Sequence, residues 1–88
     1  MVSKDFTIVN KQGLHMRPVQ DFVKAMMKYS SEITIKFNGK DVNGKSIMLI
    51  MAACIKYGAQ ITVVCNGADE EAMLAEAAAM IESGFGED

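Results

Sequence analysis

Several residue types on which common binding and catalytic sites depend are scarce in this sequence. Its 88 residues contain no tryptophan, one proline, two cysteines and one histidine. The cysteines, Cys54 and Cys65, lie eleven residues apart in apolar surroundings, with no CxxC pair and no clustered histidine. This pattern argues against a zinc site and predicts two buried free thiols, which suit a reducing compartment. We therefore expect no bound metal and no cofactor.

Long apolar runs are also missing. The longest run, residues 47–55, has nine residues, whereas a membrane-spanning helix requires ~20. Residues 1–5 begin no apolar core of the kind found in a signal peptide. The sequence thus predicts neither a membrane span nor export, and the cytoplasm is the expected location.

The residues that are present suffice for one small folded domain over residues 1–88. Half of them are hydrophobic, which argues against a disordered chain, and no linker, repeat or low-complexity tract interrupts the sequence. The net charge of −2 hides an asymmetry, because residues 1–68 hold nine basic and four acidic residues, whereas residues 69–88 hold seven acidic residues and no basic one. We therefore expect a basic face from the first part of the chain and an acidic helix and tail at its end.

Hydrophobic periodicity predicts the element order β-α-β-β-α-β-α. Strands are expected at residues 2–9, 32–37, 40–42 and 60–65. Helices are expected at residues 16–28, 47–54 and 70–83. The apolar face of the first helix is expected to hold Val19, Phe22, Val23, Met26 and Met27.

Local signals support these boundaries. Asn38-Gly39 is typical of a two-residue hairpin turn, and Pro18 fits only the first turn of a helix. Ser46 and Asp69 are expected to cap the second and third helices. The order predicts the α+β class, as an open-faced β-sandwich in which a four-stranded antiparallel sheet carries three helices on one face.

The one histidine, His15, lies where the first helix is expected to begin, in Gly13-Leu14-His15-Met16-Arg17-Pro18. Unpaired N–H groups and the positive end of the helix dipole disfavour an imidazolium there, so a neutral, nucleophilic ring is expected. The same groups favour a bound phosphate, and Arg17 adds a permanently charged donor fork. With no second histidine and no nucleophile elbow, a catalytic triad is excluded. The residues alone fit a phosphoryl acceptor, but they leave an N-cap or an ordinary surface histidine open.

Two stretches, residues 13–18 and Asn43-Gly44-Lys45-Ser46-Ile47-Met48, make the sequence resemble the HPr family of phosphocarriers in the phosphoenolpyruvate-dependent sugar phosphotransferase system. The similarity covers nearly the whole chain, including the order of its elements. It implies that His15 accepts phosphate through Nδ1 from phosphorylated enzyme I and passes it to the A domain of a sugar-specific enzyme II. Arg17 would steady the phosphoryl group. The protein would be a relay without turnover of its own, and a monomer suits that role.

The resemblance also implies a second modification site, at Ser46. In the Gram-positive branch of the family the matching serine is phosphorylated by an ATP-dependent kinase and serves catabolite control. HPr kinase/phosphorylase and a catabolite-control regulator are therefore expected partners. Capping the second helix and accepting a phosphate are compatible roles, and added charge at Ser46 is expected to slow transfer from enzyme I.

The run at residues 47–55 is apolar on every side, so one sheet cannot bury all of it. An exposed apolar patch is expected, and such patches often mark interaction sites. We expect Met48 and Met51 to be exposed contacts because methionine adapts to several partners. The resemblance implies that this helix lies beside His15 in a docking surface. Other expected members of that surface are Met16, Lys24, Lys45 and Ile47.

Three positions depart from the family pattern. Met16 stands where alanine or threonine is usual, while Leu49 and Cys54 stand where glycine is common in the Gram-positive branch. The backbone N–H of Met16 can still serve a phosphate, so the departures concern partner fit more than chemistry. Cys54 is expected near the end of the second helix and close to the active loop.

Other interpretations remain open. A regulatory carrier of a nitrogen-related phosphotransferase system would use the same chemistry with other recipients, although Lys45-Ser46-Ile47-Met48 favours the sugar branch. From a different class, a non-catalytic α+β binding module remains possible. An RNA-binding β-α-β-β-α-β module would need a basic sheet with exposed aromatic side chains, whereas only Phe37 is available there and the pI is about 5.3. We therefore expect no nucleic-acid partner.

Overall fold

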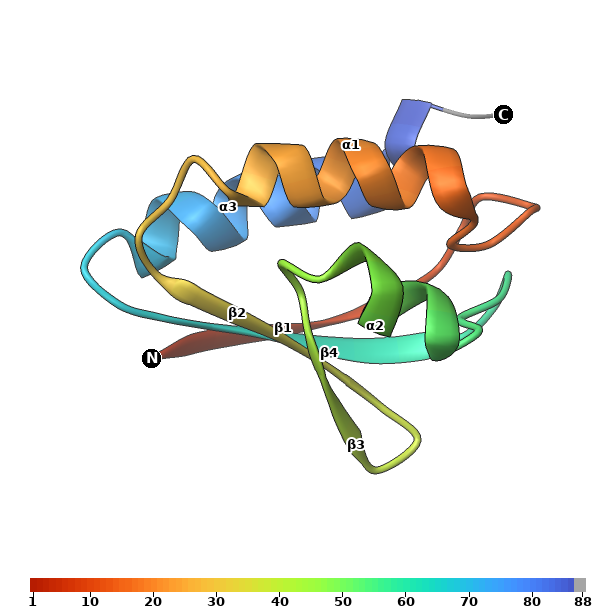
Figure 1. Ribbon diagram of the computed structural model, residues 1–88, viewed down its shortest axis with the longest axis horizontal. Helices are drawn as coiled ribbons and strands as arrows, with labels where there is room; N and C mark the ends of the chain where they lie inside the picture. The colour runs from red at the N-terminus through yellow and green to blue at the C-terminus, as the bar shows by residue number, and fades with distance from the viewer. Residues whose placement is uncertain (87–88) are drawn as a thin grey trace.

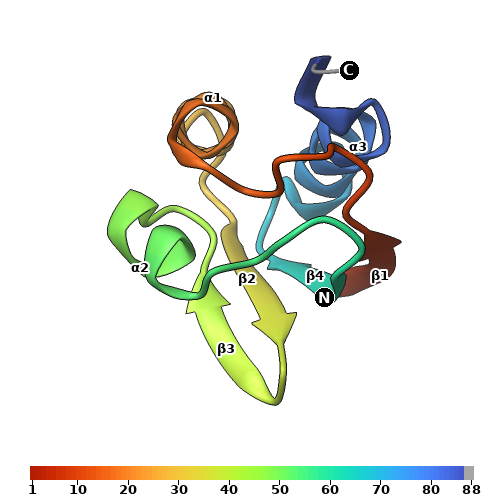
Figure 2. The same ribbon diagram turned by 90° about the vertical axis from the view of Figure 1, so that its right-hand side faces the viewer.

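The computed structural model describes residues 1–86 and shows three helices on one face of a four-stranded sheet (Figure 1, Figure 2). The strands are β1 (Val2–Thr7), β2 (Glu32–Phe37), β3 (Lys40–Asn43) and β4 (Gln60–Asn66). The helices are α1 (Met16–Met26), α2 (Ile47–Ala52) and α3 (Glu70–Glu82), followed by a short 3-10 turn, η1 (Gly84–Gly86). The predicted α+β class and element order are confirmed. Within residues 1–86, no helix is long and apolar enough to cross a membrane.

The sheet has the order β1-β4-β2-β3, and all neighbouring strands are antiparallel. Phe6 of β1 lies opposite Ile61 of β4, and Ile35 of β2 lies opposite Val63 of β4. Because alternate residues of a strand share a face, the pattern that predicts these strands also places their apolar side chains beneath the helices. Buried side chains of this core include Ile8, Val19, Phe22, Met26, Ile33, Ile35, Ile50, Met73 and Ile81.

Helix α1 has one narrow apolar face. Its residues Val19, Phe22, Val23 and Met26 are buried, as the periodicity predicts. Met27, expected on the same face, is 62% exposed, so that part of the prediction is wrong. The regular helix ends at Met26, and Met27 is only its C-cap. Because Met27 lies at the edge of the apolar face and beyond the last helical turn, its side chain no longer faces the sheet.

Helix α2 is shorter than predicted, because it ends at Ala52 rather than at residue 54. Cys54 adopts a left-handed backbone conformation with φ +54°, and its N–H donates to the Met51 carbonyl at 3.2 Å. A residue in this conformation just after the C-cap terminates a helix. The same turn leaves Cys54 exposed, whereas Cys65 is buried in β4. The prediction of two buried thiols thus holds only for Cys65, and burial raises the pKa of that thiol.

Strand β1 also ends earlier than predicted, at Thr7 instead of residue 9. Ile8 leaves the regular ladder to bond with the loop before β4: its N–H donates to the Ala59 carbonyl and its carbonyl accepts from the Gly58 N–H, both at 2.9 Å. The remaining predicted boundaries differ from the structure by at most two residues.

Asp69 occupies the N-cap position of α3 but does not cap it with its side chain. Its carboxylate instead accepts hydrogen bonds from the Ser30 N–H at 3.0 Å, from the Ser31 N–H at 2.9 Å and from the Ser31 hydroxyl. These bonds, above all the one from the Ser31 side chain, lower the pKa of Asp69 to about 2. Asp69 therefore joins the start of α3 to the start of β2, which is a different role from the predicted cap.

Candidate functional site

His15 is the N-cap residue of α1. Its backbone is extended, with φ −90° and ψ −175°, and its carbonyl accepts the first helical hydrogen bond from the Val19 N–H at 3.2 Å. The imidazole is half-buried and makes no capping hydrogen bond to the helix. The position expected from the sequence is therefore correct, while the ring itself does not serve as the cap.

The turn that carries His15 is built around Asn10. The Asn10 side-chain amide donates to the Gly13 carbonyl at 2.5 Å, and the Gly13 N–H donates back to the Asn10 carbonyl at 3.0 Å. Asn10 is only 1% exposed, so these bonds form where water does not compete. Asn10 was not among the residues expected to form the site. An asparagine that begins a four-residue turn is the signal that could have suggested this role.

A second loop fixes the same turn from the other side. The Leu14 N–H donates to the Ile55 carbonyl at 2.9 Å. Gly13 has φ +68°, and a Cβ placed on it would lie 2.7 Å from the Lys56 Cα and 2.8 Å from the Ile55 oxygen. No side chain fits into that space. Glycine is thus required at position 13 both for its conformation and for the close approach of the two loops.

The start of α1 offers donors to an anion beside His15. The first N–H groups of any α-helix have no acceptor within the helix. Pro18 carries no N–H, so Met16 and Arg17 supply the backbone donors of this turn. The Arg17 side chain is exposed, and among the residues that the structure describes it forms no ion pair. A phosphate held here would meet backbone dipoles and a guanidinium together.

Other basic side chains differ in whether they form an ion pair, bond to the backbone or remain without an ion pair. Lys4 and Lys28 form ion pairs with Glu82 and Glu76 of α3, both at 3.0 Å. Lys24 is exposed on the last turn of α1 and has no ion pair within residues 1–86. Lys45 donates to the Tyr29 carbonyl at 2.8 Å, which directs it toward the end of α1 remote from His15. Lys45 was expected in a docking surface beside His15, and the structure does not bring it near that residue.

Lys11 and Lys56 are two cations on the loops that meet at Gly13, and neither was among the expected site residues. Lys11 lies in the turn between Asn10 and Gly13, and the backbone of Lys56 is in contact range of Gly13. Both side chains are exposed, and neither has an ion pair among the described residues. Their proximity follows from the contact between the two loops, which no local motif reveals.

Helix α2 presents the expected exposed apolar surface, but the residues that form it differ in part from those expected. Met48 is 78% exposed and Leu49 is 52% exposed, and Met16 at the start of α1 is 48% exposed. Ile47 and Met51 are half-buried and pack against the core. Met51 is therefore less exposed than predicted, and Leu49, which was considered only as a departure from the family pattern, is part of the patch. Helix α2 packs against α1, as Figure 2 shows.

Ser46 is the N-cap of α2, as predicted. Its hydroxyl oxygen accepts a hydrogen bond from the Leu49 N–H at 3.2 Å, and the residue is half-buried. Its neighbour Lys45 bonds to Tyr29 beyond the end of α1. Ser46 and His15 consequently lie toward opposite ends of the paired helices, and the structure does not bring them together.

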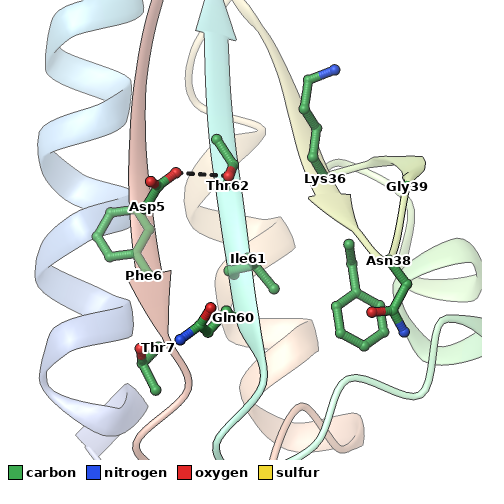
Figure 3. Close-up of a pocket in the computed structure, with 10 residues that line it drawn as sticks. Asp5, Phe6, Thr7, Lys36, Asn38, Gly39, Gln60, Ile61 and Thr62 are labelled. Carbon is green, nitrogen blue, oxygen red and sulfur yellow. Dashed lines mark hydrogen bonds between the residues drawn. The ribbon is translucent and has the colours of Figure 1, made fainter.

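A shallow hollow lies elsewhere, on the uncovered face of the sheet (Figure 3). It is mostly polar, and its side chains include Asp5, Lys36 and Gln60. Thr62 donates to Asp5 there at 2.7 Å, so two of its polar groups already satisfy each other. His15 does not line this hollow, nor does any cysteine or serine. Among residues 1–86, no group of histidine, cysteine and acidic side chains could hold a metal.

Comparisons with known proteins agree on one family. The family profile described as "PTS HPr component phosphorylation site" matches residues 2–83. The chain is 42% identical over 83 residues to the phosphocarrier protein HPr of Borreliella burgdorferi, covering 94% of this chain and 96% of that protein. It is 35% identical over 88 residues to the phosphocarrier protein HPr of Xylella fastidiosa, covering 100% and 99%.

A solved structure of HPr from Thermoanaerobacter tengcongensis matches with a TM-score of 0.96 and 40% identity, covering 100% of this chain and 99% of that one. Family profile, sequence relatives and structure therefore agree over nearly the full length. The chain belongs to the HPr family, the phosphocarriers of the phosphotransferase-system relay whose partners are enzyme I and enzyme II.

Proposed function

We propose that His15 is the phosphoryl acceptor of this chain. The observation that carries the proposal is the placement of its imidazole at the start of an eleven-residue helix, on a turn held rigidly by Asn10 and by the loop at Ile55. A ring nitrogen there, Nδ1 by resemblance to the family, attacks the phosphorus carried by enzyme I. A new N–P bond forms as the bond between phosphorus and enzyme I breaks. Transfer to the A domain of enzyme II repeats the exchange with His15 as the leaving group.

The surroundings of His15 are suited to the charge that transfer brings. A neutral imidazole becomes an adduct that carries the phosphoryl oxygens, and the N–H groups of Met16 and Arg17 are the nearest backbone donors in the first turn. The Arg17 guanidinium can bind two oxygens at once, which lysine cannot do. We therefore assign Arg17 to phosphate stabilisation.

The test is a phosphorylation assay with phosphoenolpyruvate and enzyme I, read by intact mass. The wild type is expected to gain one acid-labile phosphoryl group, and His15→Ala is expected to gain none. Arg17→Lys should still be phosphorylated but more slowly, because a point charge replaces a two-pronged donor. Lys36→Arg, on the uncovered face of the sheet, is the matched control for exchange of one cation for another. A wild type that gains no phosphate refutes the proposed role of His15.

The docking surface for enzyme I and the enzyme II A domain is proposed to consist of the apolar face of α2 with its neighbours on α1. The contributing residues are Met16, Lys24, Ile47, Met48, Leu49 and Met51. The large exposure of Met48 and Leu49 supports this assignment, since neither side chain contributes to the core. Met48→Ser should raise the KM for transfer from enzyme I with little effect on stability, because the side chain is already in water.

Ser46 is proposed as a site of regulatory phosphorylation by an HPr kinase/phosphorylase, read by a catabolite-control regulator. A phosphate on Ser46 would lie at the N-terminus of α2, where backbone N–H groups favour it, while it adds negative charge beside exposed Met48. ATP and the kinase should give an acid-stable phosphate that Ser46→Ala abolishes. Ser46→Asp should accept phosphate from enzyme I more slowly than Ser46→Ala; equal rates for the two variants would contradict the regulatory role.

A further inference from the structure

The C-terminal end of the described chain forms a left-handed turn that carries an aromatic side chain. Gly84, Phe85 and Gly86 have φ values of +66°, +58° and +76°. Glycine adopts this conformation readily, whereas a bulky residue rarely does. Phe85 therefore occupies a strained backbone conformation, and such conformations persist only where the surrounding structure imposes them.

Contacts of the Phe85 ring explain why the turn is held. The ring packs edge-on against Phe22 of α1, with 6.2 Å between ring centroids and an interplanar angle of 80°. It also closes a small, entirely apolar cavity whose walls include Leu14 and Val19. Leu14 directly precedes His15, and the Val19 N–H bonds the His15 carbonyl. The ring thus borders the same cavity as Leu14 and Val19, the two residues through which it is connected to His15.

The backbone of the same segment touches the His15 turn at a second place. A Cβ placed on Gly84 would lie 3.6 Å from the Asn10 Cβ and 3.7 Å from the Val9 Cγ2. Asn10 is the residue whose side chain holds the Gly13 carbonyl. Residues 84–85 therefore support the His15 turn both through Asn10 and through Leu14.

We propose that Phe85 is a positioning residue for His15. Its ring keeps Leu14 and the first turn of α1 in place, so that the imidazole stays aligned with the donors at the start of the helix. The inference rests on the proposed role of His15 as phosphoryl acceptor. Phe85 is half-buried at the edge of the core, and its ring contacts Phe22 and borders the same small cavity as Leu14 and Val19. It is proposed to act through these residues and not on the phosphate itself.

The experiment compares Phe85→Ala with two reference variants. Phe85→Leu keeps an apolar side chain that occupies most of the space of the ring. Leu74→Ala removes a half-buried side chain near the beginning of α3, at the end of that helix away from η1 (Figure 1), and serves as the control for lost packing. All are assayed at a temperature where each remains folded, by kcat/KM for phosphate acceptance from enzyme I and by hydrogen exchange at the Leu14 N–H.

Phe85→Ala is expected to lower kcat/KM by about tenfold, because small displacements of a reacting group have large effects on rate. Phe85→Leu should restore most of the rate, and Leu74→Ala should leave it within about twofold even if it lowers the melting temperature equally. Exchange at the Leu14 N–H should accelerate only in Phe85→Ala. Equal losses in Phe85→Ala and Leu74→Ala, or an unchanged Leu14 exchange rate, would overturn the proposal. If the wild type accepted no phosphate, the proposed role of His15 would be refuted. Hydrogen exchange at the Leu14 N–H would still test whether Phe85 holds the turn in place.

Discussion

Replacing Cys54 by glycine should stabilise this protein, although it removes a side chain. Cys54 has φ +54° and an exposed side chain at the end of α2. A left-handed conformation costs a non-glycine residue about 1–2 kcal/mol. Glycine avoids that cost but loses about 0.4–1 kcal/mol through the greater freedom of its unfolded chain. Because the exposed thiol contributes little packing, the free energy of unfolding should rise by about 0.5–1 kcal/mol.

The assay is urea denaturation of the wild type, Cys54→Gly and Cys54→Ala under reducing conditions. Cys54→Ala removes the thiol but keeps a Cβ, so its stability should stay close to that of the wild type. For a domain of this size a gain of about 1 kcal/mol corresponds to a rise of roughly 4–8 °C in melting temperature. Phosphate acceptance by Cys54→Gly should be unchanged, because the backbone of Ile55 and Lys56 keeps its contacts with the His15 turn.

The opposite substitution provides an internal check. Gly58 also has a positive φ, +82°, and a Cβ placed there would meet nothing within 4 Å. Gly58→Ala should therefore destabilise the protein by about 1 kcal/mol through backbone conformation alone. If Cys54→Gly were no more stable than Cys54→Ala while Gly58→Ala behaved as expected, the reasoning for Cys54 would be refuted, since strain would then be absent at that residue.

Three further predictions concern the site and its supports. Gly13→Ala should lose more than about 2 kcal/mol and transfer phosphate poorly, because its Cβ would collide with the backbone of Lys56; Gly39→Ala, at a positive φ with open space around it, should lose much less in the same denaturation series. Ser46→Ala should lose about 1 kcal/mol, the usual value of an N-cap, whereas Ser46→Thr should keep most of it. Asp69 has its pKa lowered to about 2 from 3.8, so its contribution to stability is complete above pH 4 and is lost as the pH falls toward 2. Denaturation curves of Asp69→Asn should therefore show a lower stability at neutral pH and a weaker loss between pH 4 and pH 2; a slope equal to that of the wild type would contradict this role.

Features that depend on local periodicity could be predicted from the sequence. The alternation in β4 places Ile61, Val63 and Cys65 in the core, because successive strand residues must point to opposite faces. The start of α1 is fixed by Pro18, which the structure confirms as a first-turn residue. His15 could be selected for the same reason, since its place relative to Pro18 determines its place relative to the helix.

Features that depend on contacts between distant segments could not be predicted in this way. Asp69 meets Ser31 across 38 residues of sequence, so its carboxylate bonds to donors outside the helix that it was expected to cap. The left-handed turn at Cys54 brings the Ile55 carbonyl to the Leu14 N–H. A cysteine in the sequence does not predict such a turn. Both the support of His15 by Asn10 and its proposed support by Phe85 belong to this class, since neither lies in a motif with His15.

The distribution of charge shows how structure changes the meaning of a sequence asymmetry. The first 68 residues are basic and the rest are acidic. Part of the excess positive charge is neutralised within the molecule, because carboxylates of α3 form ion pairs with Lys4, Lys28 and the N-terminal amine. The basic side chains left without such pairs in the described chain include Lys11, Arg17 and Lys56, which lie on or beside the loops that meet at His15. We therefore expect these unpaired cations near α1, rather than the net charge of the first 68 residues, to attract a negatively charged partner.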